Sequence, residues 1–219
     1  MNTILSPSNG HTENGNEKDY IKEAMFGKKE EDELAAGDDD EASLASEAGV
    51  DDSGARKLAV EGVRKFLDEN PDASANAIVE VVTNQQMASA LKSQDKVYIL
   101  VMAAITPNFF KKKEVAKYSD ALVKITNNNK IMERHLIAAL EALSIDKPKN
   151  FPVLIKQFYD EDALAEETIL EWADAGRTEY TLDVVDEDTR AALRGEAEPV
   201  VVWLQEADSE DDSDEDSDE

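Results

Sequence analysis

Apolar residues recur every three or four positions through the middle of the chain, a spacing typical of amphipathic helices. The first such segment follows Asp52-Ser53 and closes before Pro71. It places four apolar residues on one predicted helix face: Leu58, Val63, Phe66 and Leu67. The same spacing returns in the segments that follow, so helices are expected along most of the central chain.

Seven further segments complete the predicted series. Ser74 suits the N-cap of a helix that carries Ile78, Val79 and Val82. Residues 97–105 are apolar on every side and can also be read as a buried strand, but their neighbours favour a central helix. The other predicted helices cover residues 115–125, 131–143, 151–158, 164–172 and 188–206. About eight helices with short connections predict an all-α fold, a HEAT-like stack of antiparallel helix pairs.

Charge is distributed very unevenly along the 219 residues, whose net charge is -27. Residues 1–53 hold 15 acidic and 4 basic side chains, and residues 54–158 hold 11 and 16. Residues 159–205 hold 14 and 3, and residues 206–219 hold 10 and none. The two ends contain too few apolar residues to offset the entropy of ordering them. We therefore predict a disordered acidic arm (1–53), a helical domain (54–207) and a disordered acidic tail (208–219).

Composition excludes several classes of protein. The chain has no cysteine, which excludes a disulfide framework, a thiolate zinc site and a cysteine nucleophile. Its negative charge disfavours binding to nucleic acid, where Lys and Arg neutralise phosphates. No apolar run reaches the roughly 18 residues that span a bilayer, and residues 1–10 lack the pattern of a secretory signal. A cytoplasmic, monomeric protein with basic partners and no membrane contact is expected.

Catalytic motifs are missing from the sequence. It contains no phosphate-binding GxxxxGK[ST] loop, no GxSxG nucleophile elbow and no HExxH zinc motif. Asp160-Glu161-Asp162 lacks the residue order of a calcium loop. A structural or surface role is expected for His11 and His135. We therefore expect neither an enzyme active site nor a metal or other cofactor, and a binding function becomes the leading hypothesis.

Two segments combine large aromatic residues with many carboxylates. The first box is residues 158–172, with the acids Asp160, Glu161, Asp162, Glu166, Glu167 and Glu171. The second box is residues 196–208, with the acids Glu196, Glu198, Glu206 and Asp208. The box aromatics Tyr159, Trp172 and Trp203 are expected to anchor the core. Because nothing nearby in the sequence neutralises the acids, they are expected to form an exposed face that attracts basic partners.

These boxes resemble the paired aromatic and acidic boxes in the C-terminal domain of the eukaryotic translation initiation factor 5 family. The resemblance extends across residues 56–207 and includes residues 61–71 and 111–118. The acid-Leu-acid-acid-Ile-Leu-x-Trp pattern of the first box, with a second Trp-Leu before an acidic tail, carries most of it. The same domain occurs in the epsilon subunit of initiation factor 2B and in factor 5-mimic proteins.

The resemblance implies a HEAT-like module that assembles the preinitiation complex. Its acidic boxes would bind the lysine-rich arm of the initiation factor 2 beta subunit, and the module would also contact the factor 3 c subunit and factor 1. The N-terminal half of factor 5 accelerates GTP hydrolysis with an arginine beside a four-cysteine zinc site. This chain has no cysteine and no arginine before Arg56, so that activity is not expected. A nucleotide-exchange domain like that of the 2B epsilon subunit, or a factor 5-mimic regulator, remains an alternative.

Two further features have open interpretations. Lys111, Lys112, Lys113 and Lys117 are spaced to give one positive helix face, which balances the acidic half, docks an acidic partner or, as a minor alternative, makes weak contact with RNA. The neighbouring Phe109-Phe110 is expected in the core. In the tail, Ser209 and Ser213 each have an acid three residues on, the context that acidophilic kinases prefer. Their phosphorylation would strengthen attraction for a lysine-rich arm, and an unmodified solubilising tail is the alternative.

Overall fold

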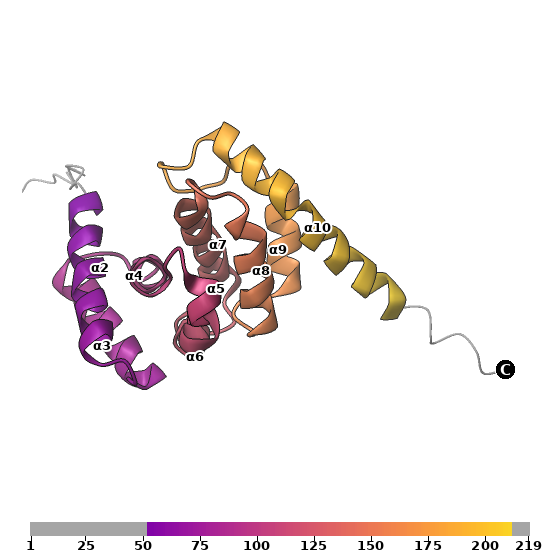
Figure 1. The fold of residues 1–219 in the computed structure, drawn as a ribbon. Coiled ribbons are helices and arrows are strands. Elements are labelled where there is room, and N and C mark those ends of the chain that lie inside the picture. The colour runs from indigo at the N-terminus through magenta and orange to yellow at the C-terminus, as the bar shows by residue number, and fades with distance from the viewer. Residues whose placement is uncertain (1–51, 212–219) are drawn as a thin grey trace, which may run out of the picture. The chain divides into compact units, whose positions relative to one another are not determined.

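A computed structural model describes residues 52–211 of the protein, with side chains described for residues 53–207. Most of the predicted arm, the end of the tail and His11 therefore lie outside the described residues. Figure 1 shows the nine helices of the described range. Their bounds are α2 Asp52–Glu69, α3 Ala75–Ala88, α4 Asp95–Ala104, α5 Phe109–Lys112, α6 Glu114–Thr126, α7 Lys130–Ser144, α8 Asn150–Asp160, α9 Glu166–Asp174 and α10 Glu187–Asp211. Strands do not occur in this range, so the predicted all-α class is confirmed.

The helices follow one another as four stacked pairs, α2–α3, α4–α6, α7–α8 and α9–α10, with the short α5 inside the second pair. The first members form one layer, in which α2 contacts α4, α4 contacts α7 and α7 contacts α9. The second members form the other layer, in which α3 contacts α6, α6 contacts α8 and α8 contacts α10. This is the predicted HEAT-like arrangement, in which each pair buries its apolar stripe against its neighbours.

The centre of the core is α4, the segment that could also have been a buried strand. Val97, Ile99, Leu100 and Val101 are completely buried, and the helix contacts α2, α3, α6 and α7. A helix that is apolar on all sides is stable only when neighbours cover every side of it. Three contiguous pairs provide that cover, which explains why the sequence of this segment shows no polar face.

The buried stripe of α2 differs in one residue from the predicted one. Ala59, Val63 and Leu67 are buried, whereas Leu58 is 67% exposed. One residue corresponds to a rotation of about 100° around a helix, so Leu58 points away from the face that packs on α4. The periodicity predicted the helix correctly and placed this one side chain on the wrong side.

The polar residues between the elements set the helix ends. Ser74 has the predicted role, because its hydroxyl accepts a hydrogen bond from the Ala77 amide at the start of α3. Asn127 adopts a left-handed backbone with φ 51° and ends α6. Asn129 then begins α7, since its side-chain oxygen accepts from the amides of Ile131 and Met132 at 3.0 and 3.2 Å. These caps satisfy amides that have no partner inside their helices.

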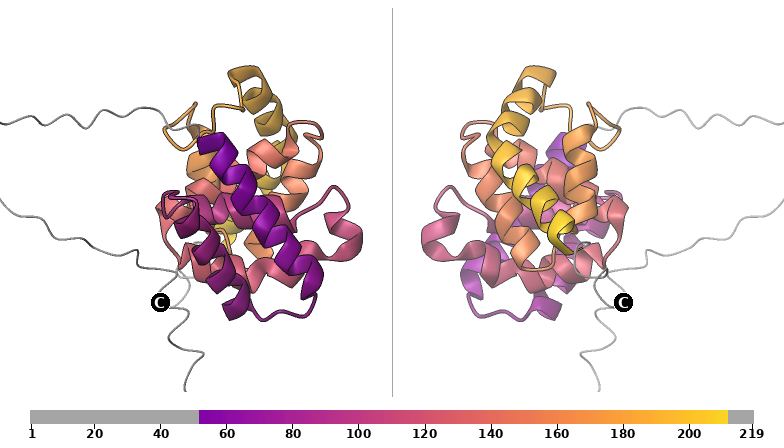
Figure 2. Two further views of the ribbon diagram at one scale, coloured as in Figure 1. Left: turned by 90° about the vertical axis from the view of Figure 1, so that its left-hand side faces the viewer. Right: turned by 90° about the vertical axis from the view of Figure 1, so that its right-hand side faces the viewer.

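Helix α10 continues to Asp211, four residues beyond the predicted end of the domain at 207. It contains Pro199, which cannot donate the hydrogen bond to the carbonyl of Gly195 one turn earlier. The right-hand view of Figure 2 shows this helix, in yellow, lying over its neighbours. None of the described helices combines the length and apolar character required to cross a membrane.

Candidate functional site

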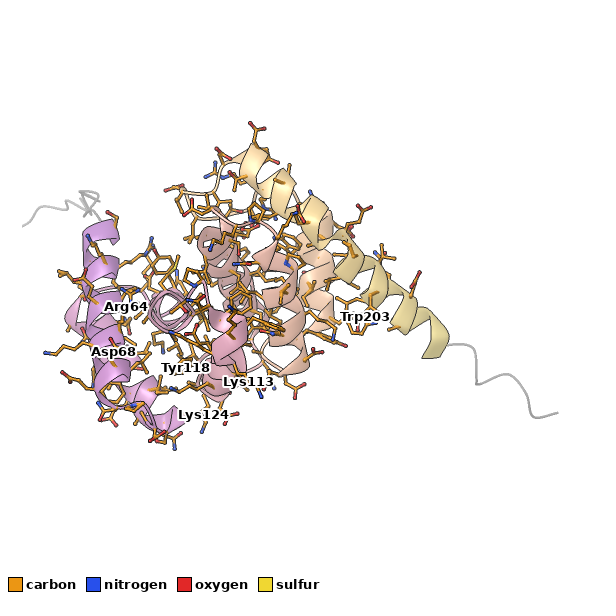
Figure 3. All side chains as sticks on the ribbon, viewed as in Figure 1. Arg64, Asp68, Lys113, Tyr118, Lys124 and Trp203 are labelled. Carbon is orange, nitrogen blue, oxygen red and sulfur yellow. The ribbon has the colours of Figure 1, made fainter. Side chains whose placement is uncertain are left out.

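Tertiary packing joins the two boxes into one surface. The first box occupies the end of α8, the following turn and α9, and the second box lies on α10, which packs on both helices. The rings of Tyr159 and Trp203 meet edge to face, with centroids 5.7 Å apart and an interplanar angle of 84°. Figure 3 shows Trp203 on the side of α10 that faces α8 and α9. Residues more than forty positions apart therefore belong to a single candidate binding site.

A buried charge pair near the start of α10 holds the three helices α7, α9 and α10 together. The Arg190 Nε donates a hydrogen bond to Oε1 of Glu141 at 3.1 Å, and both side chains are only 2% exposed. A second guanidinium nitrogen, NH1, donates to the carbonyl oxygen of Ala175 at 2.9 Å, just after α9 ends. Arg190 thus binds a carbonyl at the negative end of the α9 dipole while it neutralises a carboxylate on α7.

Trp172 completes this buried network. Its indole Nε1 donates to Oε1 of Glu141 at 2.8 Å, and its ring packs on Phe151 with centroids 5.0 Å apart. The side chain is 8% exposed, which makes it a core residue. Burial raises the pKa of Glu141 above its usual value, and the hydrogen bonds from Trp172 and Arg190 partly oppose that shift. Burial thus disfavours the charged form of this carboxyl group, and the two donors favour it.

Trp203 does not anchor the core, contrary to the expectation from its sequence. It is 41% exposed, and its neighbour Val202 is 43% exposed. The buried stripe of α10 instead runs through Leu193, Ala197 and Leu204, which belong to the hydrophobic core. Trp203 lies at the edge of that stripe, where its ring contacts Tyr159 and the ammonium group of Lys156 and is otherwise partly exposed to solvent.

Several acids of the first box are neutralised by residues outside it, which corrects the expectation of an uncompensated face. Lys130 of α7 forms ion pairs with Glu167 and Glu171 of α9, and Arg134 forms another with Glu171. The two cations are four residues apart on α7 and the two acids are four residues apart on α9, so both pairs lie one helical turn apart and face each other. Hydrogen bonds from Lys130 and Arg134 lower the pKa of Glu171 below its usual value. This pair of carboxylates helps to fix α9 on α7.

The remaining box acids divide into two groups. Asp160 pairs with Lys156 one turn earlier in α8, and Glu161 accepts a hydrogen bond from the Ser119 hydroxyl at 3.0 Å. Four other box acids form no ion pair with any cation in the described part of the chain: Asp162, Glu166, Glu196 and Glu198. We call these four the unpaired acids. Glu206 is exposed, and the side chain of Asp208 lies outside the described ones, as do Ser209 and Ser213.

The long connection between α9 and α10 packs back onto α7. Tyr180 contacts the ring of His135 edge-on at 5.1 Å, and the guanidinium of Arg134 lies 5.3 Å from its ring centroid. Half-buried beneath the loop, His135 has a pKa below its usual value, mainly because burial disfavours its charged form. Within residues 53–207, no group of three or more His, Cys, Asp and Glu side chains is placed to hold a metal ion.

The predicted basic face is split between two helices. Lys113 has a left-handed backbone with φ 52°, which ends α5 before α6 begins at Glu114. All four lysines (111, 112, 113 and 117) are exposed, but they do not share one helix. Phe110 is also 67% exposed, which corrects its expected core position, whereas Phe109 is 4% exposed. In Figure 3 the labelled Lys113 lies well apart from Trp203.

Sequence reasoning missed the cations that organise this site. Arg190 is in register with Leu193 and Ala197 on the apolar stripe of α10, and Glu141 follows Leu140 on the apolar stripe of α7. A charged residue of opposite sign on each of two apolar stripes is the sequence pattern that could have predicted this buried ion pair. No comparable signal marked Lys130 or Lys156, because an exposed lysine on a helix is ordinary.

Comparisons with known proteins agree with this architecture. Residues 132–214 match the W2 family, described as eIF4-gamma/eIF5/eIF2-epsilon. Eukaryotic translation initiation factor 5 of Pongo abelii is 24% identical over 159 residues, which cover 65% of this chain and 36% of that protein. The Drosophila melanogaster factor 5 is 31% identical over 117 residues, which cover 51% of this chain and 24% of that protein. This chain thus spans about a third of the length of the Pongo abelii protein and about a quarter of the length of the Drosophila protein.

The described part of the chain is therefore all-helical and similar to the W2 family over residues 132–214. More specifically, it is similar to the C-terminal domain of translation initiation factor 5. A solved structure titled "The C-terminal Domain of Translation Initiation Factor 5 at low pH" has the same fold, with a TM-score of 0.55 and 20% identity. The match covers 72% of this chain and 97% of that one.

Replacing Arg190 by Met should strongly destabilise the domain. The change leaves the carboxylate of Glu141 buried without its cation, which costs about 3 kcal/mol in the free energy of unfolding. The double variant Glu141→Gln/Arg190→Met should lose clearly less, since no buried charge remains and the amide oxygen still accepts from Trp172. Urea unfolding at neutral pH measures both values. Equal losses in the two proteins would contradict the idea that the uncompensated charge dominates.

Proposed function

We propose that this domain is a translation initiation module that works by binding other factors and not by catalysis. Its acidic surface binds the lysine-rich arm of the initiation factor 2 beta subunit. The observation that carries this proposal is the contact of Tyr159 with Trp203, which joins the first box on α8 to the second box on α10. The resemblance of the two boxes to those of the factor 5 family suggests this partner, and the charge of the surface suits its chemistry.

Electrostatics favours a basic, extended partner. Glu196 and Glu198 on α10 are exposed, and Asp162 lies in the turn before α9. Such unneutralised carboxylates attract a lysine-rich segment from a distance, which speeds encounter and makes the affinity sensitive to salt. The paired acids Glu167 and Glu171 contribute less, because Lys130 and Arg134 already neutralise them. In this proposal the unpaired acids carry most of the attraction.

Reversing three unpaired acids should abolish binding of the lysine-rich arm. Glu166→Lys, Glu196→Lys and Glu198→Lys together convert attraction into repulsion, so binding should fall by at least about tenfold at physiological salt. A matched control reverses three exposed acids elsewhere: Glu61 on α2, Asp72 in the following turn and Glu80 on α3. Both triple variants change the net charge equally. Isothermal titration with the arm peptide compares them, and equal losses would contradict a localised site.

The basic surface is proposed to dock the other partners, the factor 3 c subunit and factor 1. Lys112 and Lys117 line a hollow of about 300 Å³ together with Arg64 of α2. Lys112 also pairs with the buried Glu114 at 3.5 Å, so it is less free to bind than Lys111 or Lys113. Asp68 and Glu114 also line the hollow, so its three cations exceed its acids by one, and with the exposed lysines beside it this surface suits an acidic segment of a partner protein.

Changing Lys111, Lys112 and Lys113 to Glu should weaken binding of these two partners and leave binding of the lysine-rich arm intact. The charge reversal lies at the basic surface, where Lys113 lies well apart from Trp203 in Figure 3. Pull-down of purified factor 1, the c subunit and the arm from the same variant tests this separation. Unchanged binding of all three would refute the docking role.

A nucleotide-exchange domain is the second candidate function, because the matching family description includes the epsilon subunit. The two functions predict opposite effects on GDP bound to initiation factor 2. An exchange domain accelerates its release, whereas a scaffold leaves the rate unchanged or slows it. Release of labelled GDP from factor 2, measured with and without this protein, decides between them.

We also propose that phosphorylation of Ser209 and Ser213 regulates binding at the same acidic surface. Each phosphate adds about -1.5 to -2 charges and would increase attraction for a lysine-rich arm.

A further inference from the structure

Lys156 occupies a corner formed by both boxes. Its ammonium nitrogen lies 4.3 Å from the centroid of the Trp203 ring and 5.9 Å from that of Tyr159. The two rings are almost perpendicular, at 84°, so they form two walls of the corner. The third contact is the carboxylate of Asp160, which forms an ion pair with the same ammonium group. A single lysine thus meets a Trp face, a Tyr ring and an acid.

These three groups are the ones that recognise an ammonium ion. Aromatic faces attract cations through the ring quadrupole, Trp most strongly, and a carboxylate adds a charged hydrogen bond. Among the described residues, Lys156 is the one cation that lies within about 6 Å of two rings. Lys130 offers a useful contrast, since it also pairs with box acids but contacts no ring in any described interaction.

The corner is open to a partner. Trp203 is 41% exposed, the side chain of Lys156 is 37% exposed and that of Asp160 is 50% exposed. A lysine side chain has a long flexible stem, so its ammonium group can leave the corner without any change in the helix that carries it. The Tyr159–Trp203 contact would remain, because it joins α8 and α10 independently of Lys156.

We propose that Tyr159, Trp203 and Asp160 form a lysine-binding site that Lys156 fills in the free domain and that a lysine of the bound arm takes over. The inference rests on the proposed binding of a lysine-rich arm and specifies how one of its lysines is held. Lys156 is then an internal competitor, which lowers the affinity for every partner that uses this corner. The exposed Trp203 is a binding residue in this arrangement.

The test compares two variants of the full chain that each remove one positive charge from the acidic surface. Lys156→Gln empties the aromatic corner, whereas Lys130→Gln leaves the corner filled and frees other carboxylates. Titration with an oligolysine peptide should give an affinity about 2- to 5-fold higher for Lys156→Gln than for Lys130→Gln. Adding Trp203→Ala to Lys156→Gln should remove that advantage. Lys156→Met, which keeps the length of the stem, should match Lys156→Gln, and circular dichroism should show unchanged helix content in all variants.

A direct readout follows Lys156 itself by NMR. Ring currents should shift its ε-methylene protons upfield in the free protein, and saturation with oligolysine should return them towards the value of a solvated lysine. If the protein binds oligolysine but Lys156→Gln and Lys130→Gln have equal affinities, or the shift persists in the complex, the competitor role is wrong while the acidic surface stands. If the protein does not bind oligolysine at all, the proposed function itself fails.

Discussion

The arrangement of the candidate site depends on the buried ion pair between Glu141 and Arg190. Each charge would be costly to bury alone, and the pair is tolerated because the remaining hydrogen-bonding capacity is used by Trp172 and the carbonyl of Ala175. These contacts connect α7, the end of α9 and the beginning of α10. They fix where α10 crosses its neighbours, and this position brings Trp203 to Tyr159. An uncharged core would bury these helices equally well, but it would constrain their relative register less directly.

This buried scaffold allows the surface charges to have different roles. Glu167 and Glu171 are used within the domain, where they attach α9 to Lys130 and Arg134 of α7. The unpaired acids are left for a partner. A similar division holds at the basic surface, where Lys112 is engaged by Glu114 and its neighbours are exposed. The excess charge of a box is therefore a poor measure of its binding capacity until the internal ion pairs are known.

The similarity to known proteins is concentrated in the same region. The W2 match covers residues 132–214, which include most of α7, all of α8 and α9, and α10 to its end. Both boxes and the buried Glu141–Arg190 pair lie inside it. The first two helix pairs carry the basic surface and complete the stack that encloses α4. In structural terms, the scaffold and the acidic site form one half of the described domain.

The sequence by itself determined the helices, their approximate ends and the HEAT-like class, because amphipathic spacing and capping residues such as Ser74 act locally. It also located the two boxes and the separation of basic from acidic segments. Only the tertiary structure decided which acids are neutralised, that Trp203 and Phe110 are exposed, and that Lys113 interrupts the basic helix face. The physical reason is that burial and ion pairing depend on neighbours from other helices. Lys130 is 37 residues from Glu167, and Arg190 is 49 residues from Glu141, so no local pattern could reveal either contact.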